Sequence, residues 1–448
     1  MELENEINKK IIEYEKMQEN KELLDYIRKI VSEKENKWDK GINNNSNSEL
    51  LTMLLFEYST GIEKITGGKV SSKYVIDKLN SSLEILRFGD FKKGFDDIVT
   101  YGTLNDNGIR KPIKVTDEQY AINCRKRQRF GAHAPTFTDE FGNIKTALVL
   151  FEKGQKLADG TALSGIDLNN LTDIRHTFFH ELTHVMEKSI VQMKDLFPHD
   201  VVFKDGEKDS IFINYAESPE HEDLVYYLDS VEEKLQSNEV LFSGISTIEI
   251  NHRKSRSRIM RNQISEGATE FISNLVMDTT GVEINESDRD RYGVQKEIVR
   301  RVFEHRGLEE SITDYLTDSH KLISYMESCK VDGKDFLHYA DEFVHANYEI
   351  GRDISDHVDR KANFDAIQKM FKKLWQDELD ENETNILRFQ LVKILSDNYN
   401  GISGDKKYFE KRIREKIDLA TSFGKALNQN FPKKKKEDVT LLNEDREV

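Results

Sequence analysis

Apolar residues recur at intervals of three and four along most of the chain, between Lys, Glu and Asp side chains. This spacing is typical of amphipathic helices, and only 5 prolines in 448 residues interrupt it. Residues 1–40 predict a charged amphipathic helix or helix pair. The polar break GINNNSNSELL at 41–51 carries serines and asparagines that can cap the next helix. The helical pattern continues to about residue 90 and returns from about residue 300, so we expect a mainly α protein.

The period of the pattern changes between about residues 98 and 155, where turn residues separate short β-type runs. The run IKTALVLFE, 144–152, holds five consecutive apolar residues, Ala147 to Phe151. Such a run suits a strand covered on both faces.

Composition and charge narrow the classes of function. Apolar residues make up 37% of the chain, which is enough for a folded core. A formal charge of -16 argues against nucleic acid or an anionic membrane as the general partner. Cys124 and Cys329 form no C-x-x-C pair, the N-terminus lacks an apolar signal region, and no window reaches a membrane span. We therefore expect a cytoplasmic protein, although export by a signal-independent route would also fit.

The segment HTFFHELTHVMEKS, 176–189, contains the most informative motif. Thr172 can cap a helix that runs from about Asp173 to Lys188, with the negative charge of Asp173 in its first turn. Within it, His180 and His184 are i and i+4 on one face, and Glu181 is turned about 100° away. This H-E-x-x-H spacing lets two imidazoles bind one zinc ion while the glutamate takes a proton from water.

A catalytic zinc site needs a third protein ligand. The metzincin pattern is excluded, because Glu187 and Ile190 occupy the positions of its glycine and third histidine. The helical run RNQISEGATEFISNLVMD, 261–278, offers Glu266 and Glu270, which are again i and i+4. Gly267 weakens this helix, which indicates that another element packs closely against it.

HELTH together with SEGATE resembles the gluzincin arrangement of the thermolysin-like superfamily of zinc metallopeptidases. The resemblance implies one catalytic Zn²⁺ held by His180, His184 and Glu266, with Glu181 as general base. It implies that Glu270 braces a ligand histidine, and that the substrate is a peptide or protein. It also implies a strand that binds the substrate backbone, and the IKTALVLFE run suits either this role or that of a core strand. His176, one turn before His180, is expected to hydrogen-bond at the rim of the site.

The resemblance also implies a residue that stabilises the oxyanion, which the sequence does not identify. Five residues lie in suitable regions: Tyr215, Tyr226, Tyr227, His252 and Tyr292.

The predicted fold class is mainly α (α+β), with a small mixed β-sheet packed on a zinc-binding helix pair. Four parts follow: an N-terminal helical region at 1–95, a zincin-like catalytic domain at 96–300 with an insert at 190–260, a C-terminal helical region at 301–430, and a flexible tail at 431–448.

Two other functions remain open at this point. The chain could be a catalytically inactive metal-binding structural or interaction protein of the same fold. It could also be a helical nucleic-acid-binding protein that uses three basic stretches, at 124–131, at 251–261 and at Lys433 to Lys436.

Overall fold

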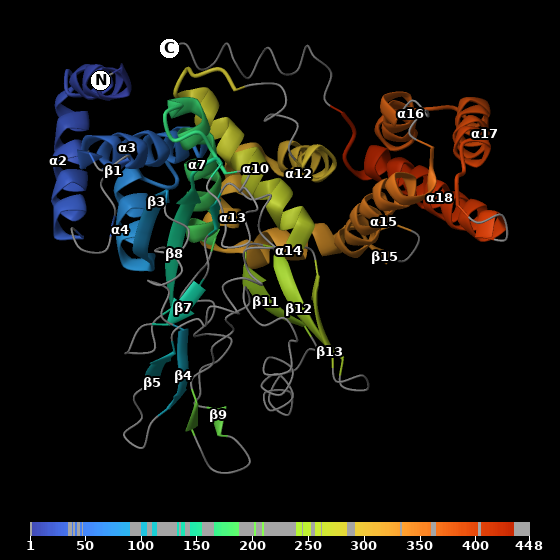
Figure 1. The fold of residues 1–448 in the computed structure, drawn as a ribbon, viewed down its shortest axis with the longest axis horizontal. Coiled ribbons are helices and arrows are strands. Elements are labelled where there is room, and N and C mark those ends of the chain that lie inside the picture. The colour runs from blue at the N-terminus through green and yellow to red at the C-terminus, as the bar shows by residue number, and fades with distance from the viewer. Residues whose placement is uncertain are drawn as a thin grey trace. The chain divides into compact units, whose positions relative to one another are not determined.

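The protein, described by a computed structural model, is mainly helical, as the spacing of its apolar residues predicts (Figure 1). The structure describes residues 2–34, 38, 41–42, 45–46, 48–89, 100–104, 110–113, 132–133, 136–138, 144–154, 165–187, 201–202, 208–209, 239–243, 245–251, 256–260, 262–284, 292–331, 334–359, 364–401 and 405–433. None of the helices in these residues combines the length and apolar character that crossing a membrane requires.

The chain divides into two compact units. The first comprises Met1–Ser265, Thr269–Arg291 and Glu309–Ser319, and the second comprises Glu266–Ala268, Tyr292–Leu308 and His320–Val448. The predicted boundaries at residues 95 and 300 stay predictions; the observed units group the N-terminal helices with the histidine-bearing helix.

The first unit contains most of the strands. Its helices are α1 (Glu2–Tyr14), α2 (Gln18–Glu33), α3 (Ser48–Ile65), α4 (Ser72–Ser82), α7 (Leu171–Glu187), most of α10 (Asn262–Thr279) and α13 (Leu308–Thr317). Its strands are β1 (Gly41–Ile42), β2 (Asn45–Ser46), β3 (Leu83–Gly89), β4 (Thr100–Leu104), β5 (Arg110–Ile113), β6 (Ala132–His133), β7 (Thr136–Thr138), β8 (Ile144–Phe151), β9 (Val201–Val202), β10 (Lys208–Asp209), β11 (Glu239–Ser243), β12 (Ser246–Asn251) and β13 (Arg256–Met260).

Strand β8 has partners on both sides. It pairs in parallel with β3 and antiparallel with β6 and β7, in the order β3-β8-β6. Its residues Leu148 to Phe151 are fully buried, and α7 lies against β8 and β6. Of the two interpretations of the IKTALVLFE run, the pairing therefore favours the core strand. A peptide could add only to an outer strand of this group.

Helix α3 lies at the centre of the N-terminal helices, because its own buried residues occur on nearly every side of the helix. It contacts α1, α2, α4 and α7.

The one buried acid of α3, Glu57, forms an ion pair with Arg175 of α7. The Nε and Nη2 atoms of Arg175 each donate to a carboxylate oxygen of Glu57 at 2.7 Å. The Tyr14 hydroxyl donates to the same carboxylate at 2.7 Å. This bidentate ion pair fixes α7 against α3.

The second unit consists almost entirely of helices. They are α12 (Gly293–Arg306), α14 (Ser319–Ser328), α15 (Phe336–His357), α16 (Phe364–Gln376), α17 (Glu381–Asp397) and α18 (Lys406–Asn430), with the short strands β14 (Lys330–Val331) and β15 (Lys334–Asp335). Phe343 of α15 stacks on Phe423 of α18 with ring centroids 4.3 Å apart and contacts Trp375 of α16. These aromatic rings form the core of the unit.

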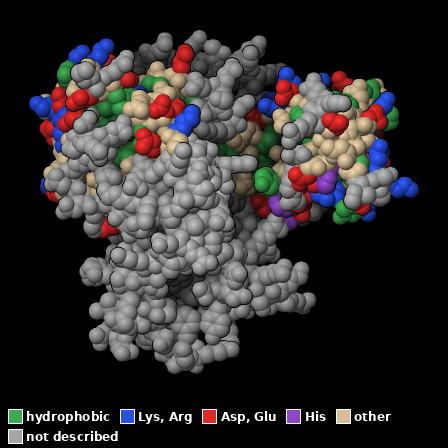
Figure 2. All heavy atoms as spheres, in the orientation of Figure 1, with side chains coloured by type: hydrophobic (Ala, Val, Ile, Leu, Met, Phe, Trp, Pro, Cys, Tyr) green, Lys and Arg blue, Asp and Glu red, His purple; other side chains and the backbone are tan. Residues whose placement is uncertain are grey.

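Charges of both signs cover the exposed helices of each unit. In the view of Figure 2, Lys and Arg side chains alternate with Asp and Glu over the N-terminal helices and over the C-terminal helices. Many form i,i+4 pairs, such as Lys73 with Asp77 at 2.7 Å. Lys433, the first lysine of the C-terminal basic stretch, pairs with the more distant Asp377 at 3.6 Å. The side chains of 124–131, of 251–261 and of Lys434 to Lys436 lie outside the described residues.

The buried pair makes a testable contribution to stability. Glu57→Gln leaves the Arg175 guanidinium buried without a carboxylate, so we expect a loss of about 3–5 kcal/mol in the free energy of unfolding. The matched control is Glu49→Gln, which breaks the half-exposed pair with Arg28 and should cost less than about 1 kcal/mol. Urea denaturation of both variants measures the difference, and equal losses would contradict it.

Candidate metal centre

Helix α7 begins where an asparagine caps it. The side-chain oxygen of Asn170 accepts the backbone N–H groups of Thr172 and Asp173 at 3.0 and 3.4 Å. The prediction of Thr172 as the cap was therefore wrong by two residues. Asparagine and threonine are both common helix caps, so the sequence offers more than one candidate here. The helix spans Leu171–Glu187. Its apolar stripe is fully buried, as predicted, through Ile174, Phe178, Leu182, Val185 and Met186.

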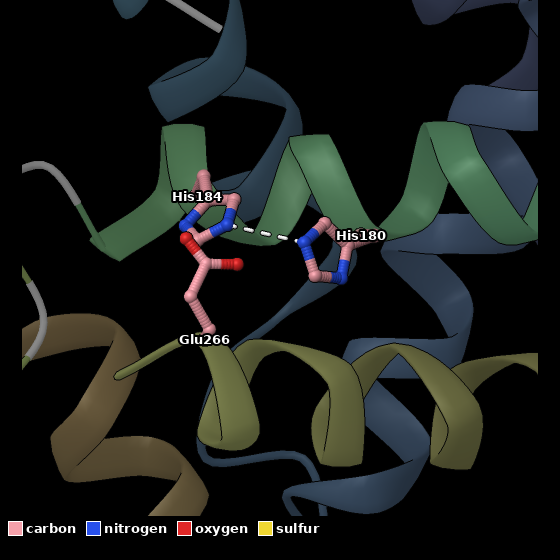
Figure 3. Close-up of side chains that lie close together, drawn as sticks. All are labelled: His180, His184 and Glu266. Atoms are coloured by element: carbon pink, nitrogen blue, oxygen red, sulfur yellow. Dashed lines mark hydrogen bonds between the residues drawn. The ribbon is translucent and has the colours of Figure 1, made fainter. Parts of the chain in front are cut away.

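The three predicted ligands lie together. One ligand atom from each of His180, His184 and Glu266 lies within 4.8 Å of the others. Figure 3 shows both imidazoles extending from α7 toward the Glu266 carboxylate of α10. All three residues are half-buried. Residues 82 positions apart in the sequence thus meet at one point because α10 runs beside α7.

A carboxylate orients each ligand histidine. The Nδ1 atom of His180 lies 3.0 Å from Glu270 Oε2, and the Nδ1 atom of His184 lies 2.6 Å from Glu187 Oε1. When each Nδ1–H donates to its carboxylate, each Nε2 carries a lone pair. Metal-bound histidines are usually held in this way.

The two Nε2 atoms face each other at 3.2 Å. Two nitrogens bound to one tetrahedral zinc at about 2.0–2.1 Å would be about 3.3 Å apart, so the observed separation fits a shared ion. The Glu266 carboxylate adds a third acceptor on the same side. Acceptors that converge in this way are stabilised by a cation, and the donor set of two imidazoles and one carboxylate is one that zinc prefers.

Glu270 serves two histidines. Its Oε1 lies 3.0 Å from Nε2 of His176, and its Oε2 bonds to His180. Burial raises the pKa of the Glu270 carboxyl, but hydrogen bonds from His176 and His180 outweigh burial and hold that pKa well below its usual range. His176 does form a hydrogen bond, as expected. Its predicted place at the rim was wrong, because only 3% of it is exposed.

Glu187 was missed as a site residue by sequence reasoning. Its position counted only against the metzincin pattern, although it stands one helical turn after His184, close enough to bond its ring. It is buried, and its Oε2 atom accepts hydrogen bonds from the hydroxyl of Thr269, at 3.2 Å, and from the hydroxyl of Tyr315. No local sequence signal links Tyr315 to this site.

The remaining predicted residues are placed as follows. Glu181 is half-buried in the same turn of α7 as His180. Tyr292 precedes α12 in a left-handed backbone conformation with φ 51°. The other four candidate oxyanion residues lie outside the described residues: Tyr215, Tyr226, Tyr227 and His252. Most of the predicted insert at 190–260 is likewise outside them.

Comparison with known proteins identifies no relatives. No protein-family model matches the chain, no curated protein is significantly similar to it, and no solved structure matches its fold. The interpretation of the site therefore depends on its own geometry.

The glycine beside Glu266 makes a close contact, as the sequence predicts. A methyl group at Gly267 would lie 2.6 Å from the backbone carbonyl carbon of Gln295 and 2.9 Å from the backbone nitrogen of Lys296. Gly267→Ala should therefore destabilise the protein by about 1–3 kcal/mol. In contrast, Gly351→Ala meets nothing within 4 Å in α15 and should stabilise it by about 0.5–1 kcal/mol. Urea denaturation checks both signs, and stabilisation by both variants would contradict the close contact.

Proposed function

We propose that the protein is a zinc-dependent metallopeptidase. The observation that carries this proposal is the pair of Nε2 atoms of His180 and His184, 3.2 Å apart, with each Nδ1 held by a buried carboxylate. This arrangement orients two lone pairs toward one point beside Glu266. The donor set leaves a fourth position for water, as catalytic zinc sites require.

The residues have distinct roles in the proposed reaction. When bound, zinc would polarise the peptide carbonyl and lower the pKa of a water molecule. Glu181 accepts the proton of that water and passes it to the leaving amine. His180, His184 and Glu266 hold the ion, while Glu270 and Glu187 hold the two imidazoles.

The gluzincin resemblance belongs to this proposal. It supplies the order of the ligands along the chain, with Glu266 as the first and Glu270 as the second of two acids on the following helix. The packing of α7 against β8 and β6 supports a zincin-like arrangement of small sheet and ligand helices. On this proposal, the substrate is a peptide or protein.

An alternative is a metal-binding protein of the same geometry without catalysis. The two functions differ only in the role of Glu181, which holds no ion and is needed only for proton transfer. Substitution of this residue therefore separates them.

Glu181→Gln tests the proposal. The variant should keep its zinc but lose hydrolysis by about 10²–10⁴-fold, because an amide cannot accept the proton. Zinc-loaded wild type and variant are incubated with a pool of diverse peptides, and new termini are counted by mass spectrometry. The control is Glu33→Gln on the exposed surface of α2, which should cleave like wild type.

Two outcomes would contradict the proposal. Wild-type protein with one zinc per chain that cleaves no peptide would favour the non-catalytic alternative. Equal cleavage by wild type and Glu181→Gln would assign the activity to other groups.

A further inference from the structure

The hydroxyl of one buried tyrosine contacts both ligand helices. Tyr315 lies on α13, and 1% of it is exposed. Its hydroxyl donates to Glu187, the last residue of α7, and lies 3.1 Å from both the backbone oxygen and the Oγ atom of Ser265. Ser265 immediately precedes Glu266 in α10. The hydroxyl therefore contacts the residue that holds His184 and the neighbour of the third ligand.

The protons around Glu187 can be assigned. The carboxylate is acceptor-only, so the side chains that hydrogen-bond to it must donate. His184 donates from Nδ1 to Oε1, while Thr269 and Tyr315 donate from their hydroxyls to Oε2. Since the Tyr315 proton goes to the charged acceptor, which forms the stronger bond, Ser265 Oγ donates to the Tyr315 oxygen. This pattern places the His184 proton on Nδ1 and leaves Nε2 with a lone pair.

The surroundings keep this arrangement in place. Burial raises the pKa of Tyr315 well above its ordinary value, and the negative charge of Glu187 raises it further, so the phenol remains a donor. Lys78 of α4 donates to the backbone oxygens of Met186 and Leu316, at the ends of α7 and α13. Burial lowers the pKa of Lys78 to about 8, while the nearby Glu187 charge raises it, so the ammonium group links the same two helices close to that buried charge.

We propose that Tyr315 is a positioning residue for the metal centre: its hydroxyl fixes Glu187, and through Glu187 the His184 ring, against the helix that carries Glu266. This inference rests on the proposed function, because it assigns Tyr315 a role in holding the zinc ligands. The proton transfer stays assigned to Glu181, and the role proposed for Tyr315 is positional.

The chain offers a matched control. Tyr58 of α3 is also fully buried, and its hydroxyl lies 3.1 Å from Thr183 Oγ1, between the two ligand histidines of α7. Thr183 donates its own proton to the backbone oxygen of Phe179, so Tyr58 is the donor in this pair. Tyr58→Phe also removes a buried hydroxyl that contacts α7, but it leaves the bonds of Glu270 and Glu187 to the two histidines intact.

The experiment compares the zinc affinity of wild type, Tyr315→Phe, Tyr58→Phe, Glu187→Gln and the double variant Tyr315→Phe/Glu187→Gln. Dissociation constants are measured by competition with a chelator. We expect Tyr315→Phe to bind zinc about 10–100-fold more weakly, the usual effect of losing an outer partner of a metal ligand. Tyr58→Phe should stay within about twofold of wild type, and the double variant should bind no more weakly than Glu187→Gln alone.

A spectroscopic readout separates positioning from general stability. Co²⁺-loaded Tyr315→Phe should show altered visible absorption bands, because the His184 ring is no longer fixed, whereas Tyr58→Phe should retain the wild-type spectrum. The proposal is overturned if Tyr315→Phe binds zinc like wild type, or if both tyrosine variants lose affinity equally.

Failure of the proposed function would look different. If wild type bound no zinc, the metallopeptidase proposal would be overturned, and so would the positioning role, because there would be no ion to position. The hydrogen-bond network can still be tested on the metal-free protein. In thermal unfolding, Tyr315→Phe and Glu187→Gln should lower Tm by less together than the sum of their separate effects. Additive shifts would overturn the network as well.

Discussion

The proposed metal centre depends on one constraint: two imidazoles on the same helix must turn the same nitrogen toward the same point. A histidine has two ring nitrogens and several rotamers, so the i,i+4 spacing alone does not set this orientation. Buried carboxylates set it here, because Glu270 and Glu187 each accept a hydrogen bond from a ligand ring through Nδ1. The opposing Nε2 atoms, 3.2 Å apart, are the direct consequence.

Two buried acids beside the ligands need a frame that stabilises their charge. Glu270 has two histidine partners, while Glu187 has hydroxyl donors and the nearby Lys78 cation. Helix α7 itself is fixed by Arg175, which pairs with Glu57 of α3 on the turn before the motif. Charged groups thus hold α7 on several sides, and its apolar stripe fills the core. We infer that this rigidity keeps the half-buried side chains of the proposed ligands in the positions that one shared ion requires.

The sequence predicts local relations and misses distant ones that no motif marks. The i,i+4 spacing identifies His180 and His184, because helix geometry alone places such residues on one face. Glu266 was predicted across 82 residues only because the gluzincin resemblance makes the first of two acids on a following helix the third ligand. Tyr315 stands 128 residues from Glu187, and nothing in its neighbourhood in the sequence marks it. The role of β8 was open for a different reason: a core strand and a substrate-binding edge strand have the same composition, and only the pairing order distinguishes them.

The most direct measurement is the metal content of the purified protein by elemental analysis, made in parallel on wild type, His180→Ala and Glu266→Ala. If α7 and α10 together form one site, wild type holds about one zinc per chain, and both variants lose it or bind it far more weakly. Wild type without zinc after reconstitution, or Glu266→Ala with unchanged zinc, would contradict a metal centre shared by the two helices.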